Sequence, residues 1–211
     1  MKSVTERVYL TDFILACFAY FLFVGSDSIV KYLGSDYSIV QIIFVNSWFA
    51  LIPIVLYTQT LNGWRKLKKA NFTVHFFRAL TMALALFFGY TGFYRLPMVT
   101  MYSIVFLIPL IITIGSVFFL GEVVRWKRFT AILIGFIGAI ISINPFGTEY
   151  DNYIFLALFC PIFASASYLI VRKYGLKENL FSFLIYGKIL MLVLTGVFAL
   201  FIFKPVSLDP V

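Results

Sequence analysis

The amino-acid sequence predicts an all-α membrane protein with about seven transmembrane helices. Apolar stretches of roughly 20 residues fill almost the whole chain, and this is the length that an α-helix needs to cross the ~30 Å hydrocarbon layer. The composition is 62% hydrophobic and 12% charged, whereas soluble domains carry roughly 25% charged residues. The stretches lack the alternating polarity of barrel strands, and a lipid-facing backbone must satisfy its own hydrogen bonds. The spans are therefore expected to be helices.

The first span is expected to be retained rather than removed as a signal peptide. Its apolar run is long, no A-x-A-like cleavage site follows, and further spans come after it. Cys17 and Cys160 both fall within apolar spans, where cysteine behaves as a small hydrophobe, and no disulfide framework or metal-binding spacing is present in the sequence. The seven spans are expected at residues 9–32, 38–57, 77–95, 98–120, 128–145, 153–171 and 182–203.

The net charge of +8 is concentrated on alternate links between the spans. If the N-terminus is cytoplasmic, most of the 17 Lys and Arg residues fall on the cytoplasmic side, as the positive-inside rule requires. This predicts an inner-membrane protein with a cytoplasmic N-terminus, and it explains the charge without a nucleic-acid partner. The longest link, 58–76, is expected to be a solvated loop; the alternative is that its segment Gly63–Lys69 lies along the membrane interface. His75 lies in this basic link and is not expected to bind a metal.

Two short segments suggest an internal repeat. Ile29–Gly34 (IVKYLG) resembles Ile170–Gly175 (IVRKYG), and each closes an apolar span before a short polar link. Five spans separate the two copies, an odd number, so the copies have opposite orientations in the membrane. On this interpretation residues 1–145 form a first repeat of five helices, 146–152 a link, and 153–211 a partial second repeat of two helices. A complete second copy needs about three more spans, so the chain is expected to be truncated unless the repeat interpretation is wrong.

The third to fifth spans contain motifs that resemble those of a known family. They include a helix-start arginine, a proline within the fourth span, a turn of a small residue and glutamate after it, and a glycine-rich fifth span. The segments are Phe77–Leu80, Pro97–Thr100, Ile108–Leu110, Phe118–Glu122, Trp126–Arg128 and Ile134–Gly138. The chain resembles the EamA family of the drug/metabolite transporter superfamily. Asp27–Gly34, His75–Leu80 and Phe118–Glu122 are most similar to the bacterial subgroup that resembles S-adenosylmethionine carriers.

The resemblance implies an integral membrane secondary transporter of a small organic metabolite. The substrate would be similar to S-adenosylmethionine or another metabolite or drug, moved by alternating access as one repeat rocks against the other. The alternative is a truncated, non-transporting membrane protein or a helix-association subunit. Family members usually have ten helices and often an arginine in the second helix of each half. Here the nearest candidates are Asn46 and, in the second half, Lys188.

The sequence contains no catalytic constellation, so an enzyme is not expected. It has no Ser/His/Asp set, no HExxH motif and no Walker-type phosphate loop, which also predicts no cofactor, no metal site and no ATP-driven transport. The expected partners are the lipid bilayer, a small-molecule substrate and a second copy of the chain in a homodimer. The pairs Gly135/Ala139 and Gly138/Ser142 permit close helix approach, either for packing or as the dimer surface.

Polar side chains within spans are expensive in lipid and are therefore candidate substrate ligands. Asp27 lies four residues before Lys31 on one helix face, which predicts a local ion pair; the alternative is that Asp27 binds a cation or proton in a cavity. Lys188 is near enough to the cytoplasmic side to snorkel, or it binds an anionic substrate group. Asn46 and Gln41 hydrogen-bond either a neighbouring helix or the substrate.

Aromatic side chains give a second group of candidates. Phe87, Tyr90 and Tyr94 form a stripe on one helix face, with Tyr102 early in the next span. Packing and interfacial placement are expected for them; the alternative is stacking on a planar or cationic substrate. The substrate-binding candidates are thus Asp27, Asn46, Tyr90, Tyr94, Tyr102 and Lys188.

Three further residues are structural or gating candidates. Arg78 matches the helix-start arginine of the family pattern. Pro109 frees a backbone carbonyl and kinks its helix, either as a gate or as a simple bend. Glu122 is expected to lock its short turn by pairing with Arg125 or Arg128.

Overall fold

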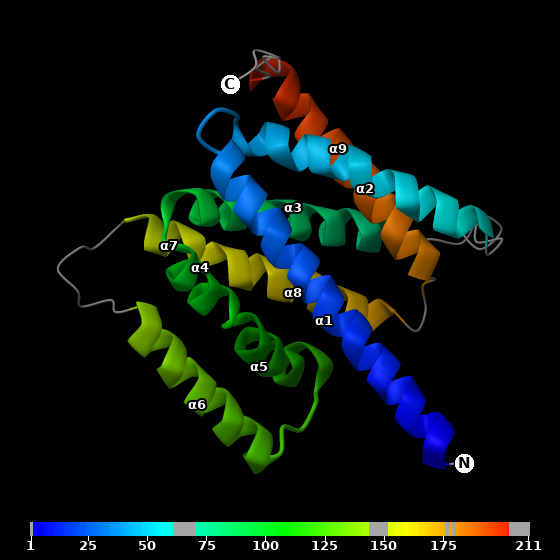
Figure 1. Cartoon of the computed structure of the whole chain (residues 1–211), viewed down its shortest axis with the longest axis vertical. Coiled ribbons are helices and arrows are strands. Elements are labelled where there is room, and N and C mark those ends of the chain that lie inside the picture. Colours follow the sequence, from blue (N-terminus) through cyan, green and yellow to red (C-terminus); the bar gives the residue numbers. More distant parts are fainter. Residues whose placement is uncertain (1, 61–70, 144–151, 176–177, 179, 203–211) are drawn as a thin grey trace.

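The structure is a computed structural model that describes residues 2–60, 71–143, 152–175, 178 and 180–202. Throughout these residues every regular element is a helix, which confirms the predicted all-α class (Figure 1). The helices are α1 (Lys2–Leu33), α2 (Ile39–Thr60), α3 (Phe72–Arg95), α4 (Met98–Val105), α5 (Ile108–Leu120), α6 (Trp126–Ile143), α7 (Tyr153–Ala157), α8 (Phe159–Tyr174) and α9 (Leu180–Ile202).

Six helical segments have the length and apolar character of membrane spans. They are Thr11–Leu33, Ile39–Thr60, Phe72–Arg95, Met98–Leu120, Tyr153–Tyr174 and Phe181–Ile202, and a shorter apolar helix covers Phe129–Ile141 within α6. Their outward faces are apolar: Phe118 is 80% exposed and Leu200 is 83% exposed. Such a surface is stable in contact with lipid rather than water. The chain is therefore a multi-pass membrane protein.

Prolines break two of these spans into paired helices. A proline ring clashes with the carbonyl four residues earlier, so a preceding helix tends to end there. Four residues before Pro109 is Val105, where α4 ends, and four residues before Pro161 is Ala157, where α7 ends. The structure interrupts the span before Pro109, where a kink was predicted, and the break before Pro161 has the same cause. Pro53, by contrast, lies within the continuous α2.

Specific caps fix the ends of α3 and α5. The Asn71 side chain accepts a hydrogen bond from the Thr73 backbone N–H at 3.1 Å, which satisfies one free donor at the start of α3. Helix α5 ends at Gly121, which has φ 68°, a left-handed conformation that glycine adopts without strain. The backbone N–H of Glu122 then bonds the Ser116 carbonyl at 3.2 Å, closing the turn.

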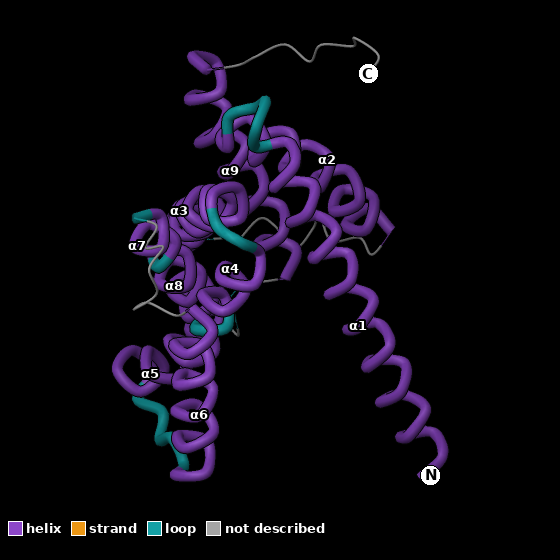
Figure 2. The backbone as a smooth tube through the Cα atoms, turned by 60° about the vertical axis from the view of Figure 1, so that its left-hand side comes forward, coloured by secondary structure: helices purple, strands orange, loops and turns teal. Residues whose placement is uncertain are grey.

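Helix α3 is the centre of the bundle. It packs against α1, α2, α4, α7, α8 and α9, while α2 also packs on α9 and α5 on α8. Helix α6 lies at the edge against α4 and α5, and the first half of α1 diverges from the other helices (Figure 2). Two buried apolar clusters flank α3: one around Met101 and Ile104 toward α7 and α8, the other around Ile43 and Met191 toward α1, α2 and α9.

Several predicted features are unpacked or lie outside the described residues. A Cβ atom added at Gly135 or Gly138 would meet nothing within 4 Å, so this face of α6 is not packed within the described chain. Two predicted features lie outside the described residues. They are the segment Gly63–Lys69 and most of the predicted link between the repeats, residues 146–151.

Candidate functional site

The inward face of α3 organises the candidate site. Arg78, Met82, Leu86 and Tyr90 recur every four residues, which places them along one helix face. Met82, Leu86 and Tyr90 belong to the buried cluster shared with α1, α2 and α9, and Arg78 lines a cavity together with Met82 and Leu86. The face spans ~18 Å at ~1.5 Å per residue, with a cation at one end and a phenol at the other.

An acidic group lies near the Tyr90 end of this face. The Tyr102 hydroxyl of α4 donates a hydrogen bond to Asp27 Oδ2 of α1 at 3.0 Å. Tyr90 is 7% exposed, and its hydroxyl interacts with Ser26, the residue before Asp27 on α1. The structure therefore brings together three of the predicted site residues, Asp27, Tyr90 and Tyr102, from three different helices.

The predicted ion pair between Asp27 and Lys31 does not form. Lys31 instead reaches α3, where its Nζ donates to the Leu96 carbonyl at 2.7 Å and to the Phe93 carbonyl at 3.3 Å. These carbonyls belong to the C-terminal end of α3, where a cation is favoured by the helix dipole. The sequence spacing was compatible with a local pair, but contacts with neighbouring helices satisfy both charges.

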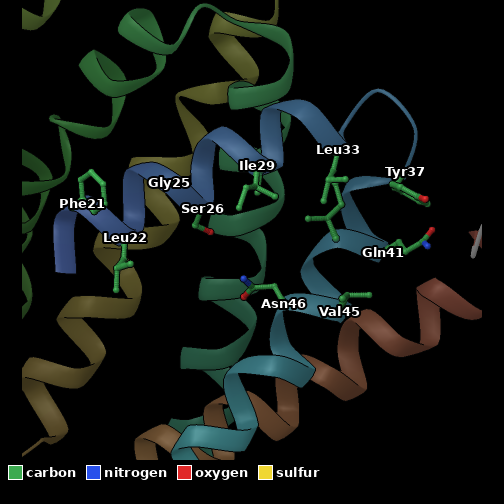
Figure 3. A pocket seen from close by; sticks show the side chains of 12 residues that line it. Phe21, Leu22, Gly25, Ser26, Ile29, Leu33, Tyr37, Gln41, Val45 and Asn46 are labelled. Carbon is green, nitrogen blue, oxygen red and sulfur yellow. The ribbon is translucent and has the colours of Figure 1, made fainter. Parts of the chain in front are cut away.

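A groove of about 630 Å³ runs between α1 and α2, and Asp27, Tyr90 and Tyr102 are not among its lining residues. Its walls are mainly apolar, with polar side chains from Ser26, Gln41 and Asn46. Ser26 on α1 and Asn46 on α2 point into the space between the two helices (Figure 3). Ligand sites in proteins are commonly ~300–1,000 Å³, mostly apolar and supplied with a few polar groups. The groove has the size and lining of such a site.

The opposite end of the α3 face is basic. Arg78 of α3 and Lys188 of α9 line a cavity of about 100 Å³, which Ile54 of α2 also borders. The Arg78 Nη1 donates to the Phe183 carbonyl at 2.8 Å, and the guanidinium lies 5.6 Å from the centre of the Phe183 ring. Arg78 was predicted as a structural residue; the structure places it in the same cavity as the substrate-binding candidate Lys188.

Sequence reasoning missed a polar contact next to this cavity. His75 was assigned to a basic link, but it lies in the first turn of α3 and is 1% exposed. Its Nε2 lies 3.3 Å from Glu178 Oε2, and Glu178 Oε1 accepts the Asn71 backbone N–H at 3.0 Å. No sequence pattern could reveal the pair, because Glu178 lies in a short link more than 100 residues along the chain.

The predicted aromatic stripe is divided between different environments. Tyr90 is buried, whereas Phe87 is 38% exposed. Tyr94 packs so closely on Gly34 that an added Cβ there would lie 2.8 Å from the Tyr94 ring. The Arg95 guanidinium lies 4.8 Å from the centre of the same ring. Only Tyr90 of the three therefore joins the interior face.

Glu122 has a different partner from the one predicted. Its Oε2 lies 2.8 Å from Arg172 Nη2 of α8, so it joins two helices instead of pairing with Arg125 within its own turn. The side chain of Arg128, the other predicted partner, lies outside the described residues. Pro109 is exposed in the first turn of α5 and contacts neither the groove nor the basic cavity through their lining residues.

The comparison with protein families decides what kind of protein this is. The model of the EamA-like transporter family matches residues 11–144, more than half of the chain. The chain belongs to the EamA-like transporter family. The family is described as one of transporters, and the relatives below are named as transporters or exporters.

This EamA-like protein has curated relatives with different named substrates. It is 30% identical to the S-adenosylmethionine uptake transporter of Rickettsia felis, over 81% of this chain and 58% of that protein. It is 24% identical to the riboflavin transporter of Vibrio cholerae, over 80% of this chain and 57% of that protein. It is 21% identical to the pseudopaline exporter CntI of Pseudomonas aeruginosa, over 82% of this chain and 61% of that protein. The chain thus spans somewhat more than half the length of these relatives, and no solved structure gives a significant match.

The family match covers one end of the α3 face more fully than the other. Asp27, Asn46, Tyr90 and Tyr102 all lie within residues 11–144 of this EamA-like chain. The basic cavity is formed partly by Lys188, which lies outside the matched residues. The acidic end is therefore part of the family domain, and the basic end is built between that domain and α9.

Proposed function

We propose that this EamA-like protein is a secondary transporter that moves a small organic metabolite by alternating access. The observation that supports this most directly is the groove between α1 and α2, whose apolar walls carry Ser26, Gln41 and Asn46. A second observation is the carboxylate of Asp27, which lies within a membrane span and faces Tyr102 of α4 instead of lining the groove. Ionisable groups in such positions are commonly part of a substrate or ion path.

S-adenosylmethionine is the first substrate to test. The relatives that share 30% identity with this chain are named as its uptake transporters. S-adenosylmethionine carries a sulfonium cation and a planar base, and an acidic carboxylate flanked by two phenol rings is chemically suited to such a molecule. In this proposal Asp27, Tyr90 and Tyr102 bind the cationic part, and Asn46, which lines the groove, binds a polar group.

The proposed arrangement in the cell follows from the charge distribution and the repeat. The chain would lie in the inner membrane with its N-terminus in the cytoplasm, since this places most Lys and Arg residues on the cytoplasmic side. Residues 1–145 and 153–211 would be inverted repeats that rock against each other, with a second copy of the chain as partner. Reporter fusions at the N-terminus and after α3 test the orientation.

Uptake of radiolabelled S-adenosylmethionine into proteoliposomes containing the purified chain tests the transport proposal. We expect Asp27→Asn to reduce uptake about tenfold, which corresponds to ~1.4 kcal/mol of lost interaction. Asp12→Asn is the matched control, because Asp12 is an exposed carboxylate on the same helix, and it should leave uptake unchanged. Equal uptake by wild type and Asp27→Asn would overturn the site assignment.

A substrate panel separates the specific proposal from the general one. Uptake of riboflavin without S-adenosylmethionine would keep the transporter and replace its substrate. An inserted, folded chain that carries no metabolite of the panel would favour the alternative of a helix-association subunit. The exposed aromatic face of α1, with Phe13, Phe18 and Phe21 each at least half exposed, would then be its contact surface.

A further inference from the structure

The basic cavity between α2, α3 and α9 contains two cations with no acidic partner among the described side chains. Arg78 and Lys188 both line it, and the two described ion pairs, His75–Glu178 and Glu122–Arg172, involve neither residue. Two positive charges in one small cavity repel each other, and burying an unpaired charge in a membrane protein is unfavourable. Both side chains are partly buried, so a negative group in the cavity would reduce their mutual repulsion.

Two carboxylates at the ends of the α3 face have hydrogen-bond partners other than Arg78 and Lys188. Glu178 uses one oxygen for the Asn71 backbone N–H and the other for the His75 ring. Asp27 accepts from Tyr102 at the other end of the α3 face, separated from Arg78 by the apolar side chains of Met82 and Leu86. No carboxylate of the described residues forms an ion pair with Arg78 or Lys188.

Unsatisfied donors are concentrated on the same helices. The Arg78 Nη1 is used by the Phe183 carbonyl, but the Arg78 Nε is buried without a hydrogen-bond partner. The other buried side-chain atoms without a partner in the described residues are Ser47 Oγ, His75 Nδ1 and Ser182 Oγ. Of these four residues, only Arg78 lines the cavity. The unpaired Arg78 Nε indicates a missing ligand or water, because buried polar atoms are almost always paired.

We propose that this cavity binds the oxyanion group of a small organic anion, with Arg78 and Lys188 as its ligands. A planar guanidinium matches the geometry of a carboxylate or phosphate, and a lysine ammonium adds a second charge-assisted contact. The volume of about 100 Å³ matches the head group alone, since it equals the share of about three water molecules in liquid water. The remainder of the anion would extend along the apolar α3 face.

This inference rests on the proposed transport function and narrows the substrate to molecules that carry a carboxylate or phosphate. Binding, however, can be measured without transport. The full chain is placed in nanodiscs of phosphatidylcholine, and its thermal unfolding is followed with acetate, inorganic phosphate and the neutral isostere acetamide. The shift in unfolding midpoint caused by each anion is compared between the wild type and a variant. This comparison cancels the general stabilisation that salts such as phosphate give to any protein.

The decisive variant is Lys188→Met, which removes the charge and keeps much of the side-chain length. Lys127→Met is the matched control, because Lys127 is exposed at the start of α6, a helix that contributes no lining residue to the cavity. We expect acetate and phosphate, but not acetamide, to raise the unfolding midpoint of the wild type and of Lys127→Met. In Lys188→Met the apparent affinity should fall at least tenfold while the midpoint without anion shows that the fold is retained.

Two results would overturn the inference. Equal anion-dependent shifts in the wild type and Lys188→Met would place anion binding elsewhere. A shift that appears only when phosphatidylglycerol is added to the nanodiscs, and not with soluble anions, would identify a lipid headgroup as the occupant. Failure of S-adenosylmethionine uptake with retained anion binding would count against the substrate of the transport proposal alone, so the two failures are distinguishable.

Discussion

The contact between Asp27 and Tyr102 gives the most direct test of how the acidic end is assembled. A double-mutant cycle of Asp27→Leu, Tyr102→Phe and the combination isolates their interaction. Leucine is preferred to asparagine, because an amide oxygen would still accept the phenol hydrogen. The oxygens are 3.0 Å apart, longer than the ~2.5–2.7 Å of the strongest O–H···O⁻ bonds. Double-mutant cycles in a membrane protein give interaction energies of ~0.6 kcal/mol on average, and hydrogen bonds to charged groups contribute ~1.5–3 kcal/mol. We therefore expect a coupling energy of about 1 kcal/mol between Asp27 and Tyr102.

The assay is equilibrium unfolding of the purified chain in mixed micelles as the fraction of denaturing detergent rises. The control cycle pairs Asp27→Leu with Tyr94→Phe, since the Tyr94 ring packs on Gly34 and its hydroxyl has no described hydrogen-bond partner. That cycle should be additive within ~0.3–0.5 kcal/mol. A coupling below about 0.3 kcal/mol for Asp27 and Tyr102 would mean that the two side chains do not meet, and it would refute the assembly of the site from α1 and α4.

The same unfolding assay checks three further predictions. Gly92→Ala should destabilise the chain by about 1–3 kcal/mol, because the new Cβ would lie 2.5 Å from Met101 Sδ in the core; Gly135→Ala, whose Cβ would meet nothing within 4 Å, should show no such loss. Glu178→Ala should lower the free energy of unfolding by about 1–3 kcal/mol, because it removes the hydrogen-bond partner of the Asn71 backbone N–H and of the buried His75 ring. An unchanged unfolding midpoint would show that water replaces the carboxylate. Glu122→Gln should cost less than about 1 kcal/mol, because both partners of its ion pair are at least one-third exposed, and a larger loss would contradict that description.

Local sequence was sufficient for the class of protein and for most of its helices. An apolar run of about 20 residues specifies a membrane helix by its own length, whatever the remainder of the chain does. The break before Pro109 was likewise predictable, because a proline acts on the carbonyl four residues earlier in the same helix. The same rule, applied to Pro161, would have predicted the end of α7 at Ala157.

The partners of polar side chains were not predictable, because they depend on how each helix is rotated and which helix it faces. Asp27 and Lys31 share a helix face, yet one contacts Tyr102 of α4 and the other the end of α3. Glu122 contacts Arg172 of another helix and not Arg125.

The sequence by itself thus determined that this protein is helical, spans a membrane many times and resembles a transporter family, since these properties follow from local composition and short motifs. Only the tertiary structure decided that Asp27 and Tyr102 meet at one end of the α3 face and Arg78 and Lys188 at the other. The physical reason is that these residues are far apart in the sequence: Asp27 and Tyr102 are separated by 75 residues. Only helix packing brings such residues within contact distance.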